Sequence, residues 1–195
     1  MASLFDTLQA QAFRAGVAPR TKDAQQWFQR NVKKLGDVNR RSLLKDDALD
    51  VTTKPKAGDM LMYFYDPKHK ATLPYYDRFP LTIMVEPAAG GFYGLNMHYL
   101  PLSLRANLMD ALYQTANNDR YDETTKLKIS YKILDGAARY KEFRPCVKRY
   151  LNSQVQSKFM YVFPSEWDIA LFLPTERFVG TSKASVWADS RRKII

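Results

Sequence analysis

The chain has 195 residues, of which 46% are apolar and 26% charged, and its formal net charge is +10. This length and composition suit a globular protein with one sizeable hydrophobic core or two small ones. No run of apolar residues approaches the roughly 18 to 20 that span a membrane, and the amphipathic N-terminus is unlike a signal peptide. We therefore expect a soluble protein that is neither secreted nor inserted in a membrane.

The positive charge is concentrated at the two ends of the chain. Residues 1–58 hold eleven Lys and Arg against six Asp and Glu, residues 59–121 hold five against six, and residues 122–195 hold fourteen against eight. Positive potential of this kind favours nucleic acid or an acidic protein as a partner. The charge count alone does not choose between the two.

Helix signals dominate the first 35 residues. Ser3 is a favourable N-cap, and the apolar spacing that follows predicts a helix over residues 4–15 with Phe13 on its apolar stripe. Thr21 is a second N-cap and predicts a helix over residues 21–35. Each helix has an apolar face that needs a partner.

The sequence then changes from helical to β-forming character. Residues 37–58 mix charges with few large apolar groups, which predicts a surface connector with a short helix around residues 42–49. Residues 59–101 contain three β-forming runs separated by turn residues. They predict a small antiparallel, SH3-like unit, in which Gly91 and Gly94 indicate a bulge or a close approach of the backbone.

The last 95 residues are predicted to be mainly helical. The helices expected from apolar spacing cover residues 101–118, 122–140 and 145–158. Residues 160–163 predict a short strand, and Ser165 with Asp168 resembles the cap of a further helix. Residues 181–195 are polar and basic around Trp187, which predicts a tail that lies across another subunit or is mobile.

These elements predict an α+β fold, with a small antiparallel β unit between two helical regions. The expected division of the chain is an N-terminal helical arm and connector over 1–58, the β unit over 59–101, a helical region packed on it over 102–178, and a basic C-terminal tail over 179–195.

The residues that most often carry catalysis are few. The only two histidines are His69, in a polar turn, and His98, in a strand where a hydrogen-bonded structural role is expected, and their spacing matches no zinc motif. The single cysteine, Cys146, has no partner for a disulfide and is expected to be a small buried apolar residue. We therefore expect no catalytic residues, no metal and no cofactor.

Acidic residues in the β unit leave one enzymatic alternative open. Asp59, Asp66, Asp77 and Glu86 are the residue type with which nucleases hold Mg²⁺, although none stands in an E-x-K arrangement. A metal-dependent nuclease is thus the third hypothesis, and it requires Asp66 or Asp77 for cleavage. No G-x-S-x-G motif indicates a serine nucleophile.

Aromatic and basic residues point instead to binding surfaces. The exposed turn of the β unit is predicted to dock other proteins through Tyr75, Tyr76, Arg78 and Phe79, with Trp187 as a further contact. A second surface, for DNA, is predicted along one or two helices that carry Arg139, Lys141, Arg144, Lys148 and Arg149.

Four segments carry a resemblance to a known family. They are AFRAGVAPRTKDAQQWF (12–28), MYFYDPKHKATLPYYDRFPLTIMVEPAAGGFYGLNMHYLP (62–101), FRPCVKRYLNSQVQSKF (143–159) and PSEWDIALFLPTERF (164–178). Together they resemble virion structural or assembly proteins of contractile-tailed phages of the T-even type, over nearly the whole chain.

The resemblance implies a non-enzymatic virion component, made in the host cytoplasm and assembled in many copies with other virion proteins. Stations compatible with it are the baseplate and hub, the neck, and the protector of packaged DNA ends. Docking to tail, baseplate or neck proteins is the leading hypothesis, and protection of DNA ends is the alternative. No membrane or small-molecule partner is expected.

Overall fold

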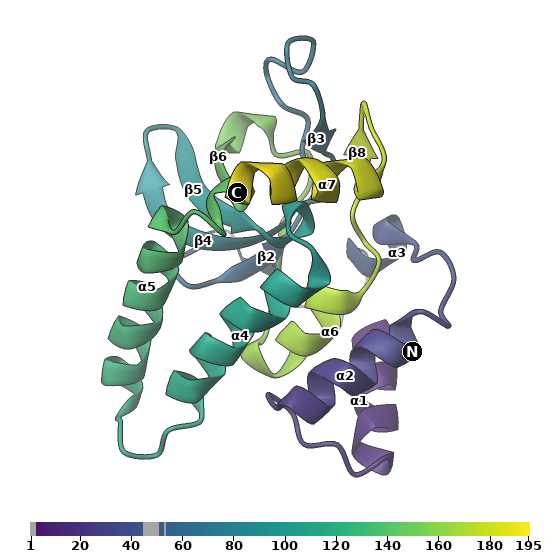
Figure 1. The fold of residues 1–195 in the computed structure, drawn as a ribbon, viewed down its shortest axis with the longest axis vertical. Helices are drawn as coiled ribbons and strands as arrows, with labels where there is room; N and C mark the ends of the chain where they lie inside the picture. Colours follow the sequence, from purple (N-terminus) through teal and green to yellow (C-terminus); the bar gives the residue numbers. More distant parts are fainter. Residues whose placement is uncertain (1–2, 45–50, 53) are drawn as a thin grey trace.

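The computed structural model describes residues 3–44, 51–52 and 54–195. Helices lie mainly to one side of the sheet, and the two N-terminal helices lie at the outer edge of this helical layer (Figure 1). The helices are α1 (Leu4–Arg14), α2 (Lys22–Val32), α3 (Arg40–Leu44), α4 (Leu102–Ala116), α5 (Glu123–Arg139), α6 (Trp167–Phe172) and α7 (Lys183–Ile194). The strands are β1 (Val51–Thr52), β2 (Met60–Met62), β3 (Tyr76–Asp77), β4 (Leu81–Ala88), β5 (Gly91–Asn96), β6 (Val147–Leu151), β7 (Phe159–Val162) and β8 (Phe178–Val179). The 3-10 helices are η1 (Met97–Tyr99), η2 (Arg144–Cys146), η3 (Asn152–Gln154) and η4 (Pro164–Glu166).

The main sheet confirms the α+β class but is larger than the predicted SH3-like unit. Its six strands are antiparallel in the order β1-β7-β2-β4-β5-β6, and β3 pairs with β8 in a second, two-stranded sheet. The strands of residues 59–101 therefore need two later strands to satisfy the backbone groups at their edges. One is β7, which confirms the short strand predicted for residues 160–163, and the other is β6, from a segment expected to be helical. The predicted unit is not self-contained.

The two faces of the sheet bury different side chains because side chains alternate along a strand. Leu81, Ile83 and Val85 of β4 belong to the main core beneath the helices. Met84 faces the other side, where a second cluster forms around Tyr63. Most rings of this cluster meet edge to face, as Tyr63 and Phe159 do at a centroid distance of 5.0 Å. Many of the aromatic residues of the β unit are therefore core residues.

The glycines of β5 confirm the expected close approach of the backbone. A Cβ atom at Gly91 would lie 1.8 Å from the carbonyl oxygen of Tyr150 in the neighbouring strand, and one at Gly94 would lie 2.2 Å from Thr82 Cγ2. Neither position leaves room for a larger residue.

The capping residues predicted the two N-terminal helices correctly, but Phe13 does not lie on the buried face as expected. Ser3 and Thr21 accept hydrogen bonds from Asp6 N and Ala24 N as N-caps. Phe13, however, is 83% exposed, because it is rotated by about 100° from the buried Ala12 and so leaves the apolar stripe. Of the helix expected around residues 42–49, the structure shows α3 ending at Leu44, and residues 45–49 lie outside the described part.

The helices α4 and α5 confirm two further predictions, and α5 begins at the N-cap Asp122. The helix predicted for residues 145–158 is wrong. That segment forms η2, β6 and η3, because β6 supplies the hydrogen-bonding partner of the edge strand β5 and alternates its side chains across the sheet. No helix in the described ranges is long and apolar enough to cross a membrane.

The C-terminal segments also differ from the prediction. Ser165 lies in η4 and does not cap α6, while Asp168 is buried and accepts a hydrogen bond from the Tyr113 hydroxyl. The expected tail forms α7, which packs on its own chain with Val186 buried and the Trp187 indole N–H donating to the His98 carbonyl at 2.9 Å. The amphipathic spacing of this segment provides α7 with a buried stripe.

Candidate nucleic-acid interface

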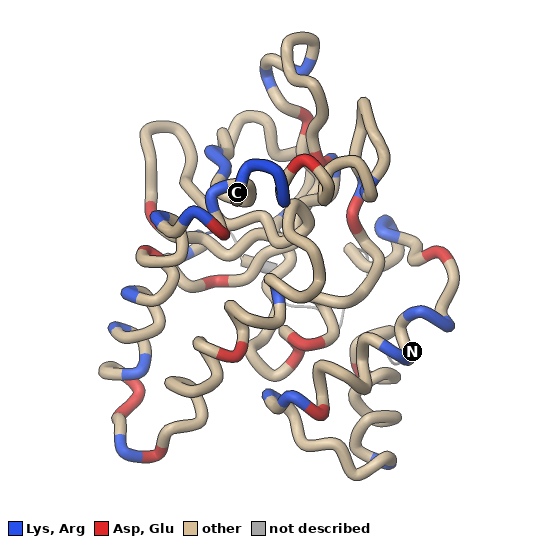
Figure 2. Tube along the Cα trace, viewed as in Figure 1, with Lys and Arg blue, Asp and Glu red and all other residues tan. Residues whose placement is uncertain are grey.

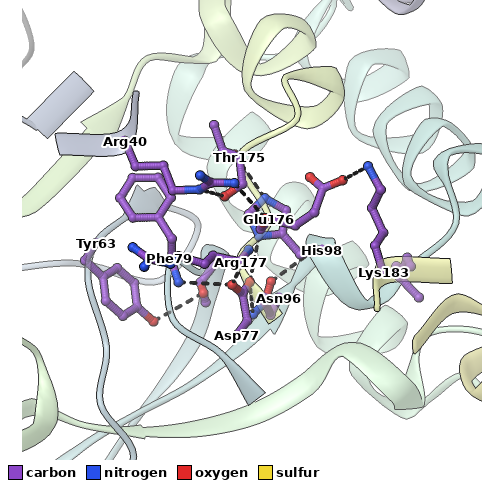
Figure 3. A network of polar contacts seen from close by, with 12 residues as sticks. Arg40, Tyr63, Asp77, Phe79, Asn96, His98, Thr175, Glu176, Arg177 and Lys183 are labelled. Carbon is purple, nitrogen blue, oxygen red and sulfur yellow. Dashed lines mark hydrogen bonds and ion pairs between the residues drawn. The ribbon is translucent and has the colours of Figure 1, made fainter. Parts of the chain in front are cut away.

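A buried polar network joins segments that are far apart in the sequence (Figure 3). Asp77 Oδ2 lies 2.6 Å from His98 Nδ1, and His98 Nε2 lies 3.2 Å from Thr175 Oγ1. The Asn96 amide donates to Asp77 Oδ2, and the backbone N–H groups of Phe79 and Arg177 donate to Asp77 Oδ1. The network thereby ties β3, η1 and the segment before β8 together.

The order acid, imidazole and hydroxyl in this network resembles that of a nucleophilic triad. Asp77, His98 and Thr175 are, however, 3%, 0% and 0% exposed, so a substrate does not reach the Thr175 hydroxyl. The hydrogen-bonded structural role expected for His98 is confirmed. Burial alone would raise the pKa of Asp77, but the His98 ring and two backbone N–H groups outweigh it and hold this pKa below its usual value.

Two arginines extend the network to α3 and α4. Arg40 donates to the carbonyl oxygens of Thr175 and Glu176, at 2.7 and 2.9 Å. Arg105 is fully buried and donates to three backbone carbonyls, and burial lowers its pKa to about 10. These guanidinium groups use their donors inside the protein, so they contribute little to a ligand surface.

The acidic residues proposed for a nuclease do not form a common site. Asp59 accepts from the Lys56 N–H, Asp66 pairs with Lys70, and Asp77 belongs to the buried network. Glu86 is exposed on β4. Within residues 3–44, 51–52 and 54–195, no group of three or more His, Cys, Asp or Glu side chains could hold a metal ion. The Cys146 thiol is buried as expected, and burial raises its pKa to about 12.

Several cationic residues come together where α5, η2 and α7 meet. The helix α7 packs against η2, the Lys141 ammonium donates to the terminal carbonyl of Ile195, and Lys193 is close enough to lower the pKa of Lys148. In Figure 2 the end of α7 forms a continuous basic stretch beside that junction. We call this group the basic cluster; its members are Lys141, Arg144, Lys148, Arg191, Arg192 and Lys193.

Lys148 and Arg149 do not lie on a helix as predicted, but on β6, where they face opposite sides of the sheet. Lys148 pairs with Gly94 in register and its ammonium lies 4.1 Å from the centre of the Tyr99 ring. Burial, followed by the charge of Lys193, lowers its pKa to about 8. Arg149 turns the other way and donates to the Ala89 carbonyl at 2.9 Å. Four of the five predicted residues thus remain near the basic cluster, and Arg149 is separate.

Sequence reasoning did not assign the basic end of α7 to this surface. The signal was present, because a helix that begins after Ser182 places Val186 and Ser190, four residues apart, on one face. In the structure both residues are buried. Arg191, Arg192 and Lys193 then lie on the exposed side of its last turn, where cations are favourable for the helix dipole.

Phe79 is buried and therefore does not belong to the predicted docking surface. That ring is 0% exposed and packs on Phe64 at 4.9 Å, because β3 brings it under the sheet, so its expected exposure is wrong. Tyr75, whose hydroxyl donates to Asp189, is half-buried, as are Tyr76 and Trp187, while Arg78 is exposed. The most exposed turn is residues 68–74, the loop that protrudes before β3 in Figure 1.

Comparison with known proteins gives one family. A family model described as the phage T4 terminal DNA protecting protein matches residues 1–191. No curated protein and no solved structure matches the chain. The match supports the coarser part of the resemblance, a virion-associated protein of T4-type phages, and it says nothing of baseplate, hub or neck. The chain therefore belongs to the family of the phage T4 terminal DNA protecting protein.

Proposed function

We propose that this protein binds the ends of linear duplex DNA and shields them from exonucleases. The observation that carries the proposal is the basic cluster, in which residues from α7, η2 and β6 gather on one side of a protein of net charge +10. The description of the family as terminal DNA protecting supports the choice of DNA over an acidic protein. Such a role needs binding and no catalytic residue, so we propose it as non-enzymatic.

The outer side of α5 extends the cluster along a line. Lys128, Lys132 and Arg139 fall within about 40° of one another around the helix axis and span roughly 16 Å along it. All three are exposed, although Arg139 also pairs with Asp135 at 2.8 Å. A row of cations of this length can contact successive phosphates of one DNA strand, and phosphate contacts supply most of the affinity for duplex DNA.

The test is protection of DNA ends in solution. A linear duplex labelled at its ends is incubated with the protein at low ionic strength and then with a 5′ or a 3′ exonuclease. We expect slower loss of the label, and we expect the Arg144→Gln, Arg191→Gln double variant to lose this protection. A double variant at Lys33→Gln, Lys34→Gln, near the exposed end of α2, removes the same charge elsewhere and should protect as well as the wild type.

Two results would reject the proposal. One is complete digestion of the DNA at every protein concentration. The other is equal inhibition when the exonuclease acts on a substrate that it enters at an internal nick, because that result would indicate binding along the duplex or to the enzyme. Docking to other virion proteins through Tyr76 and Arg78 stays a separate prediction, to be tested by cross-linking in assembled particles.

A further inference from the structure

An open hollow lies between α4 and α5, next to the basic cluster. It encloses about 690 Å³, and its apolar lining includes Leu104 and Leu108 of α4, Ile133 of α5 and Phe143. Its exposed members are Lys132 on the outer side of α5, Tyr140 at the end of that helix, and the polar residues Asn107 and Glu142. An apolar hollow with a cation at its edge is suited to a flat ring that carries a negative charge on one side.

Tyr140 is placed to be the stacking surface of this hollow. It is the C-cap of α5 and is 64% exposed. A Cβ atom at Gly136 would lie 3.9 Å from Tyr140 Cε2, so the ring folds back over the helix at the one position where no side chain intervenes. One face of the ring is thereby supported by α5, and much of the rest is open to solvent.

The charged residues beside the hollow indicate which kind of ligand it binds. Arg139 and Lys141 flank Tyr140 in the sequence, Arg144 follows one turn later, and the carbonyl of Tyr140 accepts from the Arg144 N–H at 3.1 Å. An exposed ring with three cations within four residues of it in the sequence favours a base attached to a phosphate backbone over an apolar peptide. The lining itself holds one acid, Glu142, and one cation, Lys132, so the excess of positive charge comes from the cations beside the hollow.

We infer that this hollow holds the terminal nucleotide of a DNA end, with its base stacked on Tyr140 and its phosphates held by the basic cluster. The inference rests on the proposed function and adds the origin of its specificity. Phosphate contacts alone recognise any part of a duplex. Only an end presents a base with one face free, and a base that lacks a neighbour on one side leaves the stack at the smallest cost. Tyr140 would therefore distinguish an end from the interior of the duplex.

The experiment compares two DNA probes of the same sequence, one a short duplex with open ends and the other closed at both ends by hairpin loops. Affinity for each is measured for the wild type, Tyr140→Ala, Tyr140→Phe and Tyr121→Ala. We expect the wild type to prefer open ends and Tyr140→Ala to lose roughly 5- to 150-fold in affinity for them, the range of one base stacked on an aromatic ring. Its affinity for the closed probe should not change.

The other variants separate stacking from general effects. Tyr140→Phe keeps the ring and should keep the preference for open ends. Tyr121→Ala removes an exposed ring at the opposite end of α5 and should bind both probes like the wild type. If Tyr140→Ala keeps the preference, or weakens binding to both probes equally, the inference is overturned while end binding stands. If the wild type itself binds both probes equally, the proposed function fails, and the inference with it.

Discussion

Asp77 and His98 face each other in the interior, with Asp77 Oδ2 2.6 Å from His98 Nδ1 and both side chains excluded from solvent. They come from β3 and η1, and Thr175 adds a third segment through the second ring nitrogen. A buried acid is tolerated only where charge or hydrogen bonds compensate it. The pair and its neighbours therefore hold these segments in place, and α7 rests on them through the bond from Trp187 to the His98 carbonyl.

Removal of the imidazole should destabilise the fold strongly. In His98→Ala the Asp77 carboxylate stays buried without its partner, and breaking a buried pair in this way costs about 3 to 5 kcal/mol. The free energy of unfolding from urea titration should fall by that amount. The matched control is His69→Ala in the exposed turn, which should leave the midpoint of unfolding unchanged. A His98→Ala protein as stable as the wild type would show that the network contributes nothing to folding.

A carboxylate in a folded protein usually adds stability as the pH rises. The buried Asp168 should do the opposite and add stability as the pH falls. Asp168 accepts from the Tyr113 hydroxyl at 2.9 Å and from the Arg20 N–H at 3.1 Å, yet burial raises its pKa to about 6. The folded state thus binds this proton more tightly than the unfolded chain, whose Asp pKa is about 3.9. This residue's contribution to stability should fall as the pH rises from about 4 to 6, by on the order of 3 kcal/mol.

Comparison with Asp168→Asn isolates this contribution from those of other carboxylates. The difference in the free energy of unfolding between variant and wild type should move in favour of the variant as the pH rises from 4 to 6, and then stay constant. Tyr113→Phe removes a hydrogen bond that lowers the pKa of Asp168, so it should shift the same transition to higher pH. A difference that is constant from pH 4 to 7 would contradict the assignment.

The elements that the sequence predicted well are those fixed by local chemistry. Ser3, Thr21 and Asp122 each cap a helix in the structure because an N-cap depends on the next three residues only. The helix predicted for residues 145–158 is wrong because the strand in this segment, β6, depends on the free edge of β5, some 55 residues earlier. Tertiary pairing of this kind overrides local propensity.

The candidate site was predictable in part for the same reason. Arg139, Lys141 and Arg144 lie within six residues, so their clustering is visible in the sequence. The approach of α7 to them is a product of packing, as is the network, where His98 and Thr175 are 77 residues apart. The hollow beside Tyr140 needs two helices in place before it exists, and residue spacing alone does not indicate it.

Two charges at the end of α7 should account for a measurable share of the salt dependence of DNA binding. Each phosphate contact contributes about 0.9 to the slope of log affinity against log salt concentration. If Arg191 and Arg192 each contact one phosphate, the double variant Arg191→Gln, Arg192→Gln should reduce that slope by about 2. Fluorescence anisotropy at several salt concentrations measures it.

The control for this measurement has the same net charge. Lys33→Gln, Lys34→Gln also removes two positive charges, but from the end of α2, which lies well away from α7 (Figure 2). Its slope should equal that of the wild type. If both double variants have the slope of the wild type, the end of α7 does not contact DNA. If both variants reduce the slope equally, the effect comes from net charge and is not specific to α7.

Gly136 should be replaceable, in contrast to Gly91. It lies inside α5, where Gly is less favourable than Ala by about 0.8 to 1 kcal/mol, and a Cβ atom there would meet Tyr140 Cε2 at 3.9 Å, an ordinary contact. Gly136→Ala should therefore raise the free energy of unfolding by about 0.5 to 1 kcal/mol. Gly91→Ala should lower it, because the added atom would overlap the Tyr150 carbonyl. Urea titration of both variants checks the pair. A loss of stability in Gly136→Ala would mean that Tyr140 packs on α5 more closely than the 3.9 Å contact implies.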